Sequence, residues 1–119
     1  HNGIIENYKH LKEMLRDEGY VFRSETDTEV LANWIECTMM RYDLSLEDAI
    51  HRALKSVHGA YAICAVDVDA EKIVCAKKSS PLALGIGDGR CRIGSDATPS
   101  LGRATEGSCY ERKTTVKRR

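Results

Sequence analysis

The chain has 119 residues, 42% of them hydrophobic and 30% charged, with equal numbers of acidic and basic side chains. This length suits one domain with a modest core, and the composition is typical of a globular protein rather than a disordered or fibrous one. The sequence contains no apolar run of 18 residues and no signal-peptide pattern, so neither a membrane-spanning helix nor a secretory leader is expected.

Three helices are expected in the first half of the chain. Asn7 suits the N-cap of a first helix that runs to about residue 18, and Gly19 suits the position just after its end. A short strand at 20–22 precedes a second helix over about 27–42, and a capping-box-like sequence at 45–48 opens a third helix that runs to about residue 54. The residues expected to be buried by these helices recur at helical spacing: Leu11, Met14, Leu15, Val30, Leu31, Trp34, Ile35, Met39, Met40, Leu46, Ala49, Ile50, Ala53 and Leu54.

Consecutive strands are expected in the second half. The apolar runs at 61–68 and 73–76, separated by a polar turn, predict a hairpin, and further strands are predicted at 82–86 and 91–93 around a Gly-Asp-Gly turn at 87–89. Residues 102–119 lack periodicity and end in a basic cluster, which predicts a disordered tail. Helices followed by hairpin-linked strands indicate an α+β domain with helices packed on an antiparallel sheet.

Several conspicuous residue types have structural explanations. The glycines at 85–89 lack the Lys-Ser/Thr of a phosphate loop and are typical of a hairpin turn. The histidines lack metal-ligand spacing. The five cysteines form no CxxC pair, so neither a zinc site nor a disulfide framework is expected, and a reducing cytosol fits best. Cys64 and Cys75 are expected to be small core residues. We therefore expect no metal, no cofactor, no nucleic acid and no membrane among the ligands and partners.

Two short segments carry candidate functional residues. Asn2 and Gly3 place a side-chain amide beside a backbone N–H, and two such donors can hold a developing oxyanion. The second segment, at 24–30, provides Asp27 at the start of a helix. Taken separately, Asn2 and Gly3 are a turn signal and Asp27 is a helix N-terminal acid favoured by the helix dipole. Their joint occurrence, with the pattern between them, favours a functional interpretation.

That pattern, HNGIIENYKHLKEMLRDEGYVFRSETDTEVLANWIE at residues 1–36, resembles the glutaminase domain of the glutamine–fructose-6-phosphate aminotransferase (isomerizing) family. The resemblance continues through HGAYA at 58–62 and KSSPL at 78–82 to GSD at 94–96, and it covers about residues 1–101. It implies a class II glutamine amidotransferase, which is an N-terminal-nucleophile hydrolase with an αββα sandwich fold. By this resemblance residues 1–101 correspond to the C-terminal part of such a domain.

The resemblance also implies a chemistry. In this family an amino-terminal cysteine, with its own α-amine as base, attacks the side-chain amide of glutamine. Asn2 and Gly3 match the family's oxyanion hole, and Asp27 matches the carboxylate that binds the α-ammonium of the substrate. The ammonia released would be used by a synthase domain that converts fructose 6-phosphate to glucosamine 6-phosphate. Glutamine is the implied ligand, and the parent enzyme is expected to be a cytoplasmic homo-oligomer.

The family's nucleophilic cysteine, its substrate-binding Arg loop and its synthase domain have no match in the 119 residues. We therefore expect a truncated αββα sandwich, a fragment that is inactive alone, with no nucleophile among its own cysteines. Two alternatives stay open. One is a non-catalytic remnant that binds a partner subunit or an amino acid. The other is an amidophosphoribosyltransferase-type glutaminase, which SETDTEV fits less well.

Overall fold

The structure is a computed structural model that describes residues 1–70, 72–80, 82–87, 90–94, 108–111 and 114–117, with side chains described only up to residue 82. The elements follow the order β1 (Asn2–Gly3), α1 (Tyr8–Asp17), α2 (Asp27–Tyr42), α3 (Leu46–Ala53), the 3₁₀ turn η1 (Leu54–Ser56), β2 (Tyr61–Asp67), β3 (Lys72–Lys78), β4 (Ala83–Gly87), β5 (Arg90–Gly94), β6 (Ser108–Glu111) and β7 (Thr114–Lys117). The chain divides into a helical unit, Gly3–Gly59, and a strand unit formed by His1–Asn2 and Ala60–Arg119.

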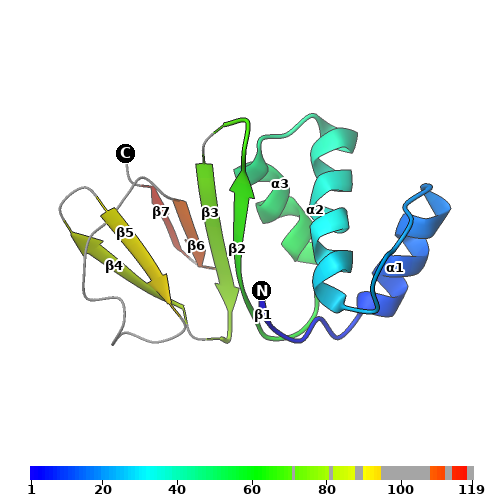
Figure 1. Cartoon of the computed structure of the whole chain (residues 1–119), viewed down its shortest axis with the longest axis horizontal. Coiled ribbons are helices and arrows are strands. Elements are labelled where there is room, and N and C mark those ends of the chain that lie inside the picture. The colour runs from blue at the N-terminus through cyan, green and yellow to red at the C-terminus, as the bar shows by residue number, and fades with distance from the viewer. Residues whose placement is uncertain (71, 81, 88–89, 95–107, 112–113, 118–119) are drawn as a thin grey trace. The chain divides into compact units, whose positions relative to one another are not determined.

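The helical unit is built around α2, which contacts both α1 and α3 (Figure 1). The three helices were predicted from their apolar spacing, and their existence and approximate bounds are confirmed. Burial of the apolar stripes removes them from water and supplies the main favourable term in folding. The buried apolar residues of this unit are Ile5, Leu11, Leu15, Val30, Leu31, Ile35, Leu46, Ala49, Ile50, Ala53 and Val57.

The end of α1 and the start of α3 have the residues and contacts that the sequence predicts, whereas the start of α1 lacks the predicted side-chain hydrogen bond. Gly19 follows α1 with a φ of +96°, a conformation that glycine adopts readily. The Ser45 hydroxyl accepts a hydrogen bond from the Asp48 N–H at the start of α3. Asn7 occupies the N-cap position of α1, but its side chain makes no capping hydrogen bond there, because it is used in the longer-range contacts described below.

The expected strand at 20–22 is wrong. The segment is irregular, and Val21 is 84% exposed. The Tyr20 N–H bonds back to the Leu15 carbonyl, while the Phe22 ring lies near the Lys12 ammonium, 5.2 Å from its centroid. These contacts fold the segment back onto α1, so its alternating apolar residues have no strand to pair with among the described residues.

The predicted helix stripes also need correction at their edges. Met40 is 74% exposed and Met14 is 41% exposed. Trp34 and Met39 are only half-buried. Trp34 lies between the apolar and polar surfaces of α2, where its indole Nε1–H donates to the Ala53 carbonyl at 3.2 Å. An amphipathic ring with a polar edge often lies at such a boundary.

The strand unit contains a five-stranded sheet in the order β1-β2-β3-β6-β7 and a separate two-stranded sheet, β4-β5. The predicted hairpin is confirmed: β2 and β3 are antiparallel neighbours (Figure 1). The Asp67 carboxylate closes their turn by accepting from the Asp69 and Ala70 N–H groups, a typical Asx turn. The β4-β5 hairpin is confirmed as well, although the expected turn at 87–89 includes residues outside the described set.

Cys75 is buried as expected, whereas Cys64 is exposed because the buried part of β2 ends at Ile63. The pairing of β3 with β6 is parallel, so the five-stranded sheet is mixed rather than wholly antiparallel. Strands β6 and β7 lie within the segment at 102–119 for which the sequence pattern predicts disorder. The α+β class itself is confirmed.

Candidate functional site

Asn2 and Gly3 form the short strand β1 at the end of the five-stranded sheet. Both residues are exposed. Gly3 has a φ of +112°, a backbone conformation that residues with a β-carbon rarely adopt. The sequence signal at these positions was a turn, and the structure instead gives an extended edge segment followed by a glycine-specific bend.

Asp27 is the first residue of α2 and is half-buried. One of its carboxylate oxygens, Oδ2, accepts a hydrogen bond from the Ile5 N–H at 2.9 Å. Ile5 is fully buried and lies two positions after Gly3. The contact therefore ties the segment that follows Gly3 to the start of a helix 22 positions away. Two of the three predicted site residues, Gly3 and Asp27, are brought near each other in this way.

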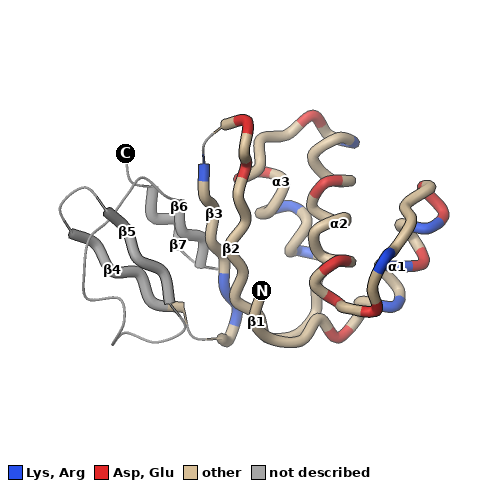
Figure 2. The backbone as a smooth tube through the Cα atoms, in the orientation of Figure 1, with Lys and Arg blue, Asp and Glu red and all other residues tan. Residues whose placement is uncertain are grey.

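The N-terminal end of α2 concentrates negative charge. Asp27 and Glu29 both lie in its first turn, and Figure 2 shows acidic residues gathered at this end of the helix. The partial positive charge of a helix N-terminus stabilises such carboxylates. A ligand bound beside Asp27 would therefore meet an anionic group, which suits a cationic ammonium rather than a carboxylate or phosphate.

A second set of contacts fixes the same N-terminal segment from the other side. The Glu6 N–H donates to the His58 carbonyl at 2.8 Å. The Asn7 side chain donates to the Ser56 carbonyl at 2.7 Å and accepts from the His58 N–H at 2.9 Å. Gly59 completes this contact, because a β-carbon there would collide with the Ile4 carbonyl.

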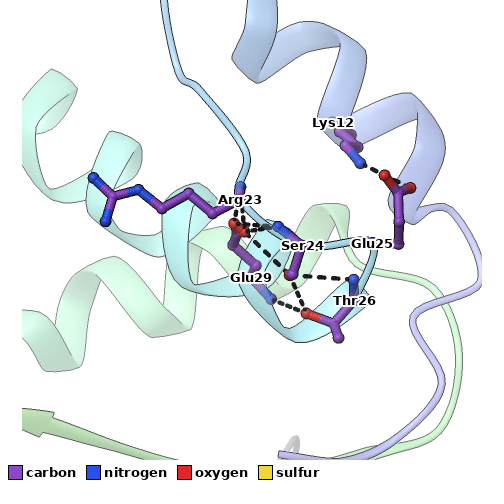
Figure 3. A network of polar contacts seen from close by, with 6 residues as sticks. All are labelled: Lys12, Arg23, Ser24, Glu25, Thr26 and Glu29. Carbon is purple, nitrogen blue, oxygen red and sulfur yellow. Dashed lines mark hydrogen bonds and ion pairs between the residues drawn. The ribbon is translucent and has the colours of Figure 1, made fainter.

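Glu29 holds the loop that leads into α2 (Figure 3). Its carboxylate accepts from the Arg23 N–H at 2.6 Å and the Ser24 N–H at 3.1 Å, and the Thr26 hydroxyl accepts from the Glu29 N–H. The hydrogen bond from the Arg23 N–H is the main reason that the pKa of Glu29 is lowered from its usual 4.5. Sequence reasoning missed this extended capping box, although the Thr-x-x-Glu spacing at 26–29 is its signal.

A cavity of about 120 Å³ lies within the helical unit. Its lining residues include Trp34, Arg41, Tyr42 and Arg52. The Arg52 guanidinium lies 3.5 Å from the centroid of the Tyr42 ring, and a hydrogen bond from Arg52 lowers the pKa of the Tyr42 hydroxyl. Asn2, Gly3 and Asp27 are not among the described residues that line this cavity.

Within the described part of the chain, no group of three or more His, Cys, Asp or Glu side chains is arranged to hold a metal ion. Among these same residues, no helix has the length and apolarity needed to cross a bilayer.

Comparison with known proteins assigns the family. A family model described as "Glutamine amidotransferase domain" matches residues 1–99. The chain is 53% identical over 102 residues to the glutamine–fructose-6-phosphate aminotransferase (isomerizing) of Chlorobaculum tepidum, covering 83% of this chain and 16% of the relative. It is 49% identical to the enzyme of that name from Methanothermobacter thermautotrophicus, covering 85% of this chain and 17% of the relative. The chain thus spans about one sixth of the length of the relatives that it matches.

A solved structure supports the same fold. The glutamine phosphoribosylpyrophosphate amidotransferase from B. subtilis, determined in complex with ADP and GMP, superposes with a TM-score of 0.65 at 30% sequence identity. The match covers 77% of this chain and 20% of that one. Over the matched part, the chain therefore has the N-terminal-nucleophile amidotransferase fold that the sequence resemblance implied, in truncated form. The chain belongs to the glutamine amidotransferase domain family, and over the matched region it is similar to glutamine–fructose-6-phosphate aminotransferases.

Proposed function

We propose that this chain contributes the oxyanion-binding and substrate-binding side of a glutaminase site whose ammonia is used to make glucosamine 6-phosphate from fructose 6-phosphate. In this proposal residues 1–101 form the C-terminal part of the glutaminase domain. The nucleophilic cysteine belongs to a segment outside the 119 residues, and the chain alone is inactive. The cytoplasmic location and homo-oligomeric assembly of the parent enzyme follow as further expectations.

The observation that carries the proposal is the hydrogen bond from the Ile5 N–H to the Asp27 carboxylate. Attack on the amide of glutamine gives a tetrahedral oxyanion, and the Asn2 amide and the Gly3 N–H are the proposed donors to it. Donors stabilise such an anion only if they are held in place before the reaction. The contacts of Ile5 with Asp27 and of Glu6 with His58 fix the chain two and three positions after Gly3, which supports the proposal that the Gly3 N–H is preorganised.

Asp27 has a second role in the proposal, as the group that binds the substrate's α-ammonium. A carboxylate can accept about four hydrogen bonds, so accepting from Ile5 and binding an ammonium are compatible. The Ile5 contact also orients the carboxylate, which reduces the ordering that substrate binding must impose. One residue would thus connect the position of the substrate with that of the segment that follows the Gly3 donor.

Sequence identity favours the sugar aminotransferase over the second candidate, an amidophosphoribosyltransferase-type glutaminase. The chain is 53% identical to the Chlorobaculum tepidum aminotransferase and 30% identical to the B. subtilis phosphoribosyl enzyme. Both candidates hydrolyse glutamine by the same chemistry. They differ in the acceptor of the ammonia, which a second domain determines.

The test uses a fusion in which the segment preceding the matched region of the Chlorobaculum tepidum relative is joined to His1. We expect this fusion to release glutamate from glutamine. Asp27→Asn keeps an oxygen that can accept from the Ile5 N–H but removes the charge that binds the ammonium. The KM for glutamine should therefore rise by about tenfold to a hundredfold, the range expected for loss of a charge-assisted hydrogen bond, while kcat changes much less.

Asp17→Asn is the matched control, because Asp17 is an exposed residue at the end of α1 and should leave both constants unchanged. An Asp27→Asn fusion with the KM of the parent fusion would contradict the substrate role of Asp27. A correctly folded fusion that binds glutamine and releases no glutamate would favour the non-catalytic binding remnant instead.

A further inference from the structure

The β2-β3 hairpin places two cysteines directly opposite each other. Cys64 and Cys75 are register partners in the antiparallel pair, and the Cys75 thiol donates a hydrogen bond to the Cys64 sulfur across an Sγ–Sγ distance of 3.1 Å. Opposed residues in such a pair have Cα atoms about 4.5–5.5 Å apart, within the range that a disulfide spans. Both side chains are reduced in the structure, and little movement separates this arrangement from a bonded one.

The two thiols differ in a way that suits a sequential reaction. Cys64 is exposed, whereas Cys75 is 1% exposed. The hydrogen bond from Cys75 lowers the pKa of the Cys64 thiol from 9.0 to about 7. The lowered pKa favours the thiolate at neutral pH, and the thiolate is the form that reacts with electrophiles and oxidants. An exposed, activated sulfur thus lies in contact with a buried one.

We propose that Cys64 is a peroxide-reactive thiol and that Cys75 is its resolving partner, so that a hydroperoxide converts the hairpin to a cross-strand disulfide. This inference is independent of the proposed glutaminase role. The Cys64 thiolate attacks one oxygen of the hydroperoxide, forming an S–O bond as the O–O bond breaks, and the other oxygen leaves as an alcohol or water after protonation. The Cys75 sulfur then attacks the Cys64 sulfenic acid. An S–S bond forms, the S–O bond breaks, and water leaves with the Cys75 proton.

The protein as a whole is oxidised by two electrons, and the hydroperoxide is reduced by two. The buried position of Cys75 is no obstacle, since its reaction partner is a sulfur that it already contacts. The two sulfurs need only approach from 3.1 Å to the bonded distance of about 2.05 Å. A thiol reductant would reverse the step by thiol–disulfide exchange.

A third cysteine provides an internal competitor. The backbone of Cys109 in β6 is the register partner of Cys75 on the opposite side of β3. Three neighbouring strands therefore carry cysteines in one row. The proposal assigns the disulfide to the Cys64 side of this row, because the described sulfur contact and the activated thiol are there.

The test treats the full 119-residue chain with hydrogen peroxide near pH 7.5, blocks remaining thiols with N-ethylmaleimide, and maps tryptic peptides by mass. Cleavage after Lys72 separates Cys64 from Cys75, and Cys37 and Cys109 fall in other peptides. We expect a disulfide that joins peptide 56–72 to peptide 73–77 and that disappears on reduction. Cys37→Ser and Cys109→Ser are matched controls that should leave this linkage unchanged.

Two substitutions of Cys75 distinguish its effect on the pKa of Cys64 from its role in forming the disulfide. Cys75→Ser keeps a hydroxyl donor but cannot form the disulfide, so Cys64 should accumulate as a sulfenic acid that dimedone traps. Cys75→Ala removes the donor, and the midpoint of Cys64 alkylation by iodoacetamide should rise from about pH 7 toward pH 9.0. Failure of the unmodified chain to form the 56–72 to 73–77 linkage under excess peroxide would overturn the proposal. A linkage of 73–77 to the Cys109 peptide in its place would also overturn it.

Discussion

The backbone at Gly59 turns against the carbonyl of Ile4 so closely that no β-carbon fits between them. Its φ of +121° would be strained in any other residue. Gly19 has a similar φ of +96°, yet a β-carbon there would meet nothing within 4 Å. A side chain at Gly19 would thus cause backbone strain alone, whereas one at Gly59 would cause both strain and a steric clash. Of the two, only Gly59 contacts the segment that follows the proposed oxyanion donors.

We predict that Gly59→Ala destabilises the chain more than Gly19→Ala does. Gly19→Ala should lower the free energy of unfolding by roughly 1–2 kcal/mol through strain alone. Gly59→Ala should lower it by at least about 1 kcal/mol more, because the Ile4 segment must also shift. Urea unfolding of both variants measures the difference, and equal losses would contradict the close contact at Gly59.

At the scale of elements, the start of α2 depends on a charge. The Glu29 carboxylate accepts from the Arg23 and Ser24 N–H groups and so holds the loop that leads into α2. Its pKa is lowered from 4.5, mainly by the hydrogen bond from Arg23. A carboxylate whose pKa is lowered by folding stabilises the folded state above its ordinary pKa, and this stabilisation is lost as pH falls through the lower, folded pKa.

The expected result for Glu29→Gln is therefore a changed pH dependence of stability. The unmodified chain should lose more stability than Glu29→Gln between about pH 6 and about pH 3, and the two unfolding curves should converge at the acidic end. Chemical unfolding followed by circular dichroism at a series of pH values measures this. Glu13→Gln, at an exposed position of α1, should keep the pH dependence of the unmodified chain, and parallel curves for Glu29→Gln would refute the charge contribution.

The elements themselves differ in how well sequence predicts them. Helices α1, α2 and α3 and the β2-β3 hairpin follow from periodicity and turn chemistry, because both are local properties. The expected strand at 20–22 fails for a non-local reason: alternation alone cannot reveal that Phe22 and Tyr20 contact α1 instead of a neighbouring strand. The N-cap position of Asn7 is confirmed, but sequence could not reveal that its side chain would bond to Ser56 and His58, about fifty positions away, instead of capping the helix.

At the scale of the molecule, the residues proposed for the site could be named from the sequence. The hydrogen bonds that hold the neighbouring segment in place could not be predicted from it. The family resemblance points to Asn2, Gly3 and Asp27. The contacts that hold the segment after Gly3, from the Ile5 N–H to the Asp27 carboxylate and from the Glu6 N–H to the His58 carbonyl, join residues 22 and 52 positions apart. Both donors are backbone N–H groups, and a backbone donor leaves no signal in the sequence, so this part of the arrangement required the structure.

The central claim is that Asn2 stabilises an oxyanion. Its most direct test is the kinetics of glutamate release by the Asn2→Ala variant of the fusion described above, with Asn33→Ala in α2 as the control. Loss of one oxyanion donor should lower kcat by about 10²–10³ with little change in KM, and the control should match the parent fusion. An Asn2→Ala variant with an unchanged kcat, or with a raised KM alone, would contradict the assignment.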